Sequence, residues 1–173
     1  LPNEDAILYF AESILPLIAE KVPHVKLTVV GRDPGPRLRL LAKSNPRILV
    51  TGAVDDVRPY IGQASCFVVP IRIGGGTRLK IFEAMSMEKP VVSTSIGAEG
   101  LPVSDGVDCF LADDATAFAH KVIATLTDRQ LAARISRQAR LLVATRFSWE
   151  SVAEEFARIC QEVGSKKARS RAA

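Results

Sequence analysis

A short segment in the middle of the chain combines glycines with cations in a way that could bind an anion. Three successive glycines allow backbone conformations with positive φ and let a ligand approach main-chain N–H groups. A helix is predicted to begin just after the glycines, and the positive end of its dipole would point toward the same ligand. A phosphate is the ligand that such a helix N-terminus favours. The residues of this candidate site are Gly74, Gly75, Gly76, Thr77, Arg78 and Lys80. A flexible glycine turn with solvated basic side chains is the alternative, because neither a P-loop nor a Rossmann glycine motif is present.

Glu83 follows within the same predicted helix, in the apolar context I-F-E-A-M. A carboxylate on a helix that packs against a sheet needs a partner. One candidate partner is Lys80, three residues earlier on the same helix face. The other is a pair of ribose hydroxyls, since an ionised carboxylate has enough lone pairs to accept both O–H groups.

Two motifs around Glu83 give this segment a family resemblance. Glu83 opens an E-A-M motif, and a P-V-V motif begins at Pro90. The segment resembles the sugar-donor-binding part of GT-B glycosyltransferases, in the retaining group that includes sucrose, glycogen and bacterial polysaccharide enzymes. That group has a further glutamate where this chain has Gly75, and a small residue where it has Glu88. With the G-G-G-T-R-L-K run, these departures resemble a bacterial subgroup of sugar transferases.

The resemblance also implies a function. Glu83 would bind the ribose of a UDP- or GDP-linked sugar, and the amides of the glycine loop would face its diphosphate or sugar. Glu83, Arg78 and Lys80 would be the catalytic side chains, the two cations stabilising the leaving diphosphate. The reaction would retain stereochemistry, need no obligatory metal, and serve bacterial polysaccharide or glycolipid synthesis. The acceptor-binding N-terminal domain would lie outside this chain, which alone would be inactive.

The elements that position these residues alternate between strand and helix. Apolar runs predict strands at 25–30, 48–51, 66–69 and 91–93, with amphipathic helices between them. This pattern indicates an α/β fold, a Rossmann-like doubly wound parallel sheet with helices on both faces. It would form one half of a GT-B fold whose first strand is missing. Residues 1–163 would make this domain, and 164–173 a basic, disordered tail.

Local signals predict where individual helices begin and end. The helix that carries Glu83 is expected over residues 77–88, with Pro90 ending it. Its buried stripe is expected to be Leu79, Phe82 and Met85. The first helix is expected to be interrupted at Pro16. The expected helix caps are Asn3 or Asp5, Asp55, Thr77, Asp113 or Asp114, and Ser148.

Four loops follow predicted strands and should meet at one edge of the sheet, where ligands of open α/β sheets bind. They are Gly31-Arg32, Gly52 to Val54, 70–77 and 95–100. The resemblance assigns the base and ribose to Gly52, Val54 and Glu83, and the phosphates to Gly31, Arg32 and the glycine loop. Glu99 would contact the sugar. Arg32 and Glu99 can equally be solvated loop residues.

The composition argues against several other classes of protein. A hydrophobic content of 47% indicates a folded domain, and no apolar run is long enough to span a bilayer. The cysteines and histidines have no metal-ligand spacing, so buried thiols and exposed imidazoles are expected. These residues are Cys66, Cys109, Cys160, His24 and His120.

The net charge of +4 originates in the last residues, 165–173, which contain four of the 23 basic side chains. A nucleic-acid-binding protein would carry its charge as a patch with aromatic residues, so no nucleic-acid partner is expected. The cytoplasm is the predicted compartment, with contact to the anionic inner face of the membrane as a further expectation. An epimerase or phosphorylase of the same fold and a non-enzymatic Rossmann-like binding module stay open as alternatives.

Overall fold

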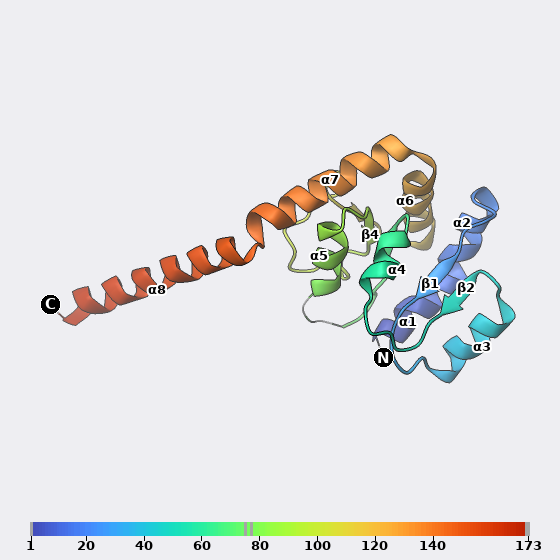
Figure 1. Cartoon of the computed structure of the whole chain (residues 1–173), viewed down its shortest axis with the longest axis horizontal. Coiled ribbons are helices and arrows are strands. Elements are labelled where there is room, and N and C mark those ends of the chain that lie inside the picture. The colour runs from blue at the N-terminus through green and yellow to red at the C-terminus, as the bar shows by residue number, and fades with distance from the viewer. Residues whose placement is uncertain (1, 75, 77, 172–173) are drawn as a thin grey trace.

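The computed structural model describes residues 2–74, 76 and 78–171, from residue 163 onward by their backbone alone. The described strands form two parallel sheets between helices (Figure 1). One sheet pairs β1 (Leu27–Val29) with β2 (Ile48–Val50). The other has the order β3 (Phe67–Val69), β4 (Val91–Ser93), β5 (Phe110–Leu111). The α/β class with parallel sheets is thereby confirmed.

Helices connect the strands and cover them. They are α1 (Pro2–Tyr9), the π-helix η1 (Phe10–Ile14), α2 (Leu15–Lys21), α3 (Pro36–Ser44), α4 (Arg58–Gln63), α5 (Leu79–Ser86), α6 (Ala115–Thr127), α7 (Arg129–Arg146) and α8 (Trp149–Arg171). α8 projects away from the rest of the molecule (Figure 1). Its backbone is helical as far as Arg171, through the segment for which we predicted a disordered tail.

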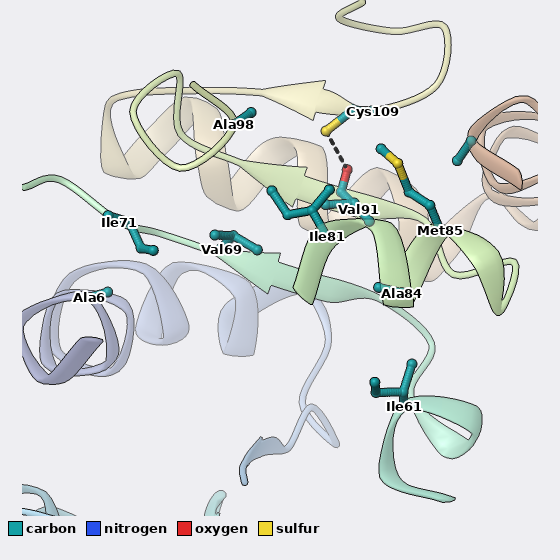
Figure 2. Close-up of a cluster of buried hydrophobic side chains, with 11 residues drawn as sticks. Ala6, Ile61, Val69, Ile71, Ile81, Ala84, Met85, Val91, Ala98 and Cys109 are labelled. Carbon is teal, nitrogen blue, oxygen red and sulfur yellow. Dashed lines mark hydrogen bonds between the residues drawn. The ribbon is translucent and has the colours of Figure 1, made fainter. Parts of the chain in front are cut away.

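The sheet β3-β4-β5 is covered on both faces, as a doubly wound fold requires. Consecutive residues of β4 point to opposite sides, because side chains alternate along a strand. Val91 packs into one buried cluster with Met85 of α5 and with Cys109, whose thiol donates to the Val91 carbonyl oxygen at 3.5 Å (Figure 2). Val92 packs into the other cluster with Phe118 of α6. Both valines are fully buried, so β4 lies at the centre of the molecule.

β1 and β2 are less buried than their continuous apolar sequences predict. Thr28 in β1 and Leu49 in β2 are exposed, whereas Ile48 is buried. Burial therefore alternates along β2, as it does in a strand with one face in solvent.

The first helix is interrupted at the predicted place. α1, η1 and α2 follow one another along the chain, and Pro16 lies in the first turn of α2. Proline has no N–H and its ring clashes with the carbonyl four residues earlier, so the wider π-helical turn before it avoids that conflict. The caps predicted at Asn3 or Asp5 are wrong, because α1 already begins at Pro2.

α5 is shorter than predicted and presents a different face to the core. It begins at Leu79, and Thr77, the predicted cap, lies outside the described residues. Leu79, expected to be buried, is 67% exposed, whereas Ile81 and Ala84 are fully buried with Met85. Of the predicted stripe, Met85 is buried and Phe82 is half-buried against the same cluster, so only Leu79 is wrong, and Ile81 occupies the core-facing position instead.

The C-terminal end of α5 also differs from the prediction. The helix ends at Ser86, four residues before Pro90. Glu88 has a φ of 54°, and the Lys89 N–H donates to the Ala84 carbonyl oxygen at 3.0 Å. This left-handed residue ends the helix in the way that a glycine usually does. A glycine would adopt this conformation without the strain that a side chain brings.

Helix caps were predicted correctly in the second half of the chain. The Asp114 carboxylate accepts from the Ala117 N–H at the start of α6, and Ser148 accepts from Ser151 at the start of α8. Asp128 caps α7, a role that the sequence analysis did not assign. The cap at Asp55 is wrong, since Asp56 accepts from the backbone N–H of Arg58.

The cysteines are less uniform than predicted. Cys109 is buried and Cys66 half-buried, but Cys160 on α8 is exposed. His24 and His120 are exposed, as expected.

Candidate functional site

The turns that follow β1 and β2 lie side by side. The Gly31 N–H donates to the Gly52 carbonyl oxygen at 3.2 Å, just past the last strand bond between Thr51 and Val29. Gly52 has a φ of 75°, which a side chain would disfavour. Arg32 is exposed, and among the described residues its side chain has no hydrogen-bond or ion-pair partner. This pair of turns thus presents backbone groups and one free guanidinium at the carboxyl ends of the strands.

The loop after β4, residues 94–100, is held tightly against the loop after β3. The Thr94 hydroxyl donates to the Ile71 carbonyl oxygen and accepts from the Gly97 N–H. Asp113 accepts from the N–H and hydroxyl of Ser95 at 2.7 and 2.8 Å. Gly97 is buried among oxygens that leave no room for a Cβ. The segment is therefore a fixed part of the sheet edge.

Arg78 joins these two loops from within. Its side chain is only 7% exposed, and its Nη2 donates to the Ile96 carbonyl oxygen at 2.7 Å and to that of Gly74 at 3.3 Å. The same nitrogen lies 3.9 Å from a carboxylate oxygen of Glu99. Its Nε is buried and has no partner among the described residues. The predicted anion-binding guanidinium is thus largely engaged with the protein itself.

Lys80 points toward the first helix rather than toward Glu83. Its ammonium donates to the Asn3 side-chain oxygen at 3.2 Å. Partial removal from water, and then repulsion by Arg78, lowers the pKa of Lys80. The pairing of Lys80 with Glu83, one of the two alternatives for this carboxylate, is absent from the described contacts.

The Glu83 carboxylate has no hydrogen bond or ion pair with any described residue, although the residue is half-buried. Glu83 helps to raise the pKa of Arg58, to a smaller degree than the hydrogen bond between Arg58 and Asp56 does. Both Glu83 oxygens are therefore available to a ligand.

α1 supports the glycine loop from outside, a role that the sequence analysis missed. Asp5 accepts from Arg72 at 2.6 Å, and this hydrogen bond lowers the pKa of the Asp5 carboxyl. A Cβ on Gly74 would lie 2.9 Å from Pro2. No sequence signal links these residues, because nearly the whole first half of the domain separates them.

The structure brings some predicted site residues together and leaves others apart. Gly74, Arg78 and Glu99 form one connected group, and Gly76 is exposed beside it with a φ of 120°. Gly75 and Thr77 lie outside the described residues. Among the described contacts, no hydrogen bond or ion pair links this group to Gly31, Arg32, Gly52 or the half-buried Val54.

Among the described residues, no group of three or more His, Cys, Asp or Glu side chains is arranged to hold a metal ion. Of the helices described, none combines the length and apolar character that crossing a bilayer requires.

Comparisons of the sequence with known proteins identify relatives of most of the chain. The family model described as glycosyl transferases group 1 matches residues 1–128. A Klebsiella pneumoniae protein, described as an uncharacterized 44.6 kDa protein in the cps region, is 30% identical over 131 residues. The match covers 71% of this chain and 34% of that protein, so the chain spans about a third of its relative's length.

Solved glycosyltransferase structures share the fold. The C-terminal domain of the group 1 protein LpcC from Francisella tularensis aligns with a TM-score of 0.73 and 20% identity, covering 86% of this chain and 83% of that one. Anabaena HepE in complex with UDP-glucose aligns with a TM-score of 0.71 and 20% identity, and the alignment covers 86% of this chain and 44% of HepE. Sucrose-phosphate synthase from Thermosynechococcus elongatus aligns with a TM-score of 0.72 and 23% identity, and the alignment covers 88% of this chain and 42% of the synthase. These neighbours have the GT-B architecture, and the fold expected from the sequence is confirmed.

Proposed function

The chain belongs to the glycosyl transferases group 1 family, and from this premise we propose that it is the sugar-donor-binding half of a GT-B glycosyltransferase. The enzyme would move a hexosyl group from a nucleoside-diphosphate sugar to an acceptor, with retention of configuration. The coverage by a C-terminal domain of a related protein supports the assignment to that half. The relative from a cps region supports a role in bacterial polysaccharide or glycolipid synthesis.

The observation that carries the proposal is the Glu83 carboxylate, which has no hydrogen-bond or ion-pair partner among the residues that the structure describes. A half-buried carboxylate without a protein partner is unfavourable, because burial removes part of its hydration. Two vicinal ribose hydroxyls would satisfy it, each donating to one oxygen. Glu83 lies on α5, the helix that follows the glycine loop. A ribose bound to the Glu83 carboxylate would therefore direct its attached diphosphate toward that loop.

Cationic and backbone groups would hold the diphosphate. Arg32 is exposed and free of described partners, and the Lys80 ammonium donates to the Asn3 side-chain oxygen. Preorganised charges and N–H groups of this kind stabilise the negative charge that develops on a leaving diphosphate. No step in this scheme requires a metal from this chain. Backbone groups of Gly52 and Val54 would contact the base of a UDP- or GDP-linked sugar, and HepE, which shares the fold, was solved in complex with UDP-glucose.

The acceptor would bind to a second domain, which we expect to precede this one in the complete enzyme. The enzyme would be cytoplasmic. If the acceptor is linked to a lipid, the enzyme would act at the inner face of the membrane. The basic residues between 165 and 173 would add attraction to anionic lipids.

Calorimetric titration with UDP, GDP and ADP tests the donor-binding assignment. We expect one nucleotide to bind, and saturation at about 100 times its Kd to add about 2.7 kcal/mol to the free energy of unfolding. Glu83→Gln keeps the size of the side chain and removes its charge, and should weaken binding at least tenfold. Glu154→Gln, an exposed carboxylate on α8, is the matched control and should bind as the parent does.

Two results would contradict the proposal. A folded chain that binds none of the nucleotides would favour the non-enzymatic binding module. Equal affinities of the Glu83→Gln and Glu154→Gln variants would refute the ribose contact.

A further inference from the structure

The helix α7 carries charge of one sign only. Its 18 residues include five arginines and no acidic residue; the arginines are Arg129, Arg134, Arg137, Arg140 and Arg146. Without the four cations of residues 165–173, the 23 basic side chains of the chain fall to 19, which equals the number of acidic side chains. The body of the protein is therefore neutral as a whole, and α7 is a positive region that negative charge elsewhere balances.

The arginines of α7 are exposed, and all but one lack an acidic partner among the described residues. The exception is Arg140, which lies 3.6 Å from a carboxylate oxygen of Glu88. Arg134 donates to the Gly106 carbonyl oxygen at 3.2 Å, and Arg137 donates to a carbonyl oxygen of its own helix. Neither of these hydrogen bonds cancels a charge, so the positive field of α7 extends into the solvent.

The exposed side of α7 combines arginines with aliphatic side chains. Arg134, Arg137 and Leu141 follow one another at intervals of three and four residues, which places them on the same side of the helix. Leu141 is 55% exposed, whereas Ile135 is fully buried and turns the other side of α7 toward the core. Val107, next to the glycine that Arg134 contacts, is 48% exposed. We call Arg134, Arg137, Leu141 and Val107 the α7 surface.

This combination of groups suits the surface of an anionic lipid bilayer. A guanidinium group binds phosphate through two parallel hydrogen bonds, and lipid headgroups present many phosphates side by side. Aliphatic side chains beside the cations can enter the boundary between the headgroups and the acyl chains. A surface for single-stranded nucleic acid would instead offer aromatic side chains for base stacking, and the α7 surface contains none. α7 also runs along an edge of the molecule, where a flat surface can reach it (Figure 1).

We infer that the α7 surface docks this domain onto an anionic lipid bilayer. The inference rests on the proposed function, to whose membrane contact it adds a folded docking surface. Arg140 of α7 donates to the Ser86 carbonyl oxygen at 3.3 Å, at the last residue of α5. The glycine loop precedes the first residue of that helix, so α7 meets the end of α5 that is remote from the donor loops.

Cosedimentation of the full chain with lipid vesicles tests the inference. Vesicles of phosphatidylcholine alone are compared with vesicles in which half of the lipid is phosphatidylglycerol, at low and at high salt. The unchanged chain should bind the anionic vesicles only, and salt should weaken the binding because it screens the charges. The double variant Arg134→Gln, Arg137→Gln should bind about tenfold more weakly or worse, since each cation near an anionic surface contributes about fivefold.

Three further variants make the result specific, and thermal melts show whether each is folded. The control Arg39→Gln, Lys43→Gln removes two exposed cations of α3, one of which donates to a backbone carbonyl oxygen as Arg134 does, and should bind as the unchanged chain does. The variant Arg134→Lys, Arg137→Lys keeps the charge and should bind within about threefold of the unchanged chain. A variant with glutamine at the four basic positions of residues 165–173 should still bind the anionic vesicles.

Several outcomes would overturn the docking surface. They are equal losses in the glutamine variants of α7 and α3, and a lysine variant as weak as the glutamine variant of α7. Loss of all binding in the variant of residues 165–173, with normal binding by the glutamine variant of α7, would also refute it. Tighter binding of the unchanged chain to an RNA oligonucleotide than to the anionic vesicles would assign the surface to nucleic acid instead.

Nucleotide binding separates this inference from the proposed function. The glutamine variant of α7 should bind UDP or GDP with the affinity of the unchanged chain, because the α7 surface is remote from the glycine loop. A folded chain that binds no nucleotide would refute the donor-binding function, whereas the comparison of the α7 and α3 variants on vesicles would still decide the docking surface.

Discussion

A single methyl group added at Gly97 should destabilise the domain. A Cβ at this position would lie 2.5 Å from the Ser93 hydroxyl and 2.7 Å from the Val69 carbonyl oxygen, where ordinary contacts begin near 3.4 Å. The Val69 oxygen belongs to the backbone of β3 and cannot rotate away, so the loop would have to move by about 0.7 Å. Overpacking of this kind costs about 1–3 kcal/mol.

The expected result for Gly97→Ala is a lower free energy of unfolding with an unchanged fold. A loss of about 2 kcal/mol corresponds to a drop of about 4–8 °C in Tm for a chain of this size. Urea unfolding monitored by circular dichroism measures the loss directly, provided that the m-value stays constant. The matched control is Gly62→Ala, in the helix α4, where the nearest atom to a Cβ is 3.8 Å away. That change should stabilise the domain by about 0.5–1 kcal/mol, because alanine favours helix.

A second substitution tests the cause. Removing the closest oxygen with Ser93→Ala should make Gly97→Ala less destabilising than it is in the parent, which a double-mutant cycle measures as a coupling energy. A Gly97→Ala variant as stable as the parent would show that the loop is not packed as described, and an effect that Ser93→Ala does not change would assign the clash to the Val69 oxygen alone.

Two further predictions concern titratable groups. Burial raises the pKa of the Cys66 thiol to about 11 and that of the Cys109 thiol to about 12. At pH 8 the native chain should therefore react quickly with a thiol reagent only at the exposed Cys160, whereas the unfolded chain should react at all three cysteines. Fast reaction of the native chain at more than one cysteine would contradict this prediction. The hydrogen bond from Arg72 lowers the pKa of Asp5 below its ordinary value of 3.8, so its contribution to stability is present at neutral pH and is lost as the pH falls through the lowered pKa. Arg72→Gln should return the Asp5 titration, followed by carboxyl NMR, to its ordinary range, and an unchanged titration would refute the pairing.

Several features that depend on neighbouring residues in the chain were predicted correctly. The strand at 91–93 has the predicted bounds, Pro16 interrupts the first helix, and the caps at Asp114 and Ser148 are present. Each of these follows from local chemistry: β-branched runs, a missing N–H, or a short polar side chain before a helix. Glu83 was singled out for the same local reason, a carboxylate among apolar residues.

The arrangement of the site depends on tertiary contacts, which local patterns do not contain. Arg78 was expected to face a bound phosphate or, in the alternative, solvent, whereas its side chain is buried between two loops. Leu79 was predicted to be a core residue, but the orientation of α5 places Ile81 against β4 and leaves Leu79 exposed. The support of the glycine loop by Asp5 joins segments 67 residues apart. No spacing rule could have identified these three.

The alternation of Val91 and Val92 between two separate cores has a consequence for how this domain can change over evolutionary time. Replacement of either β4 valine by another apolar residue of similar volume should be tolerated, because the replacement still points into the same core as the valine did. A single-residue insertion or deletion would instead exchange the two sets of side chains and shift every following residue by one position. The 94–100 loop would then lose its register against the glycine segment. We therefore expect length between the end of α5 and Glu99 to be a stricter constraint on this lineage than the identity of the residues in it.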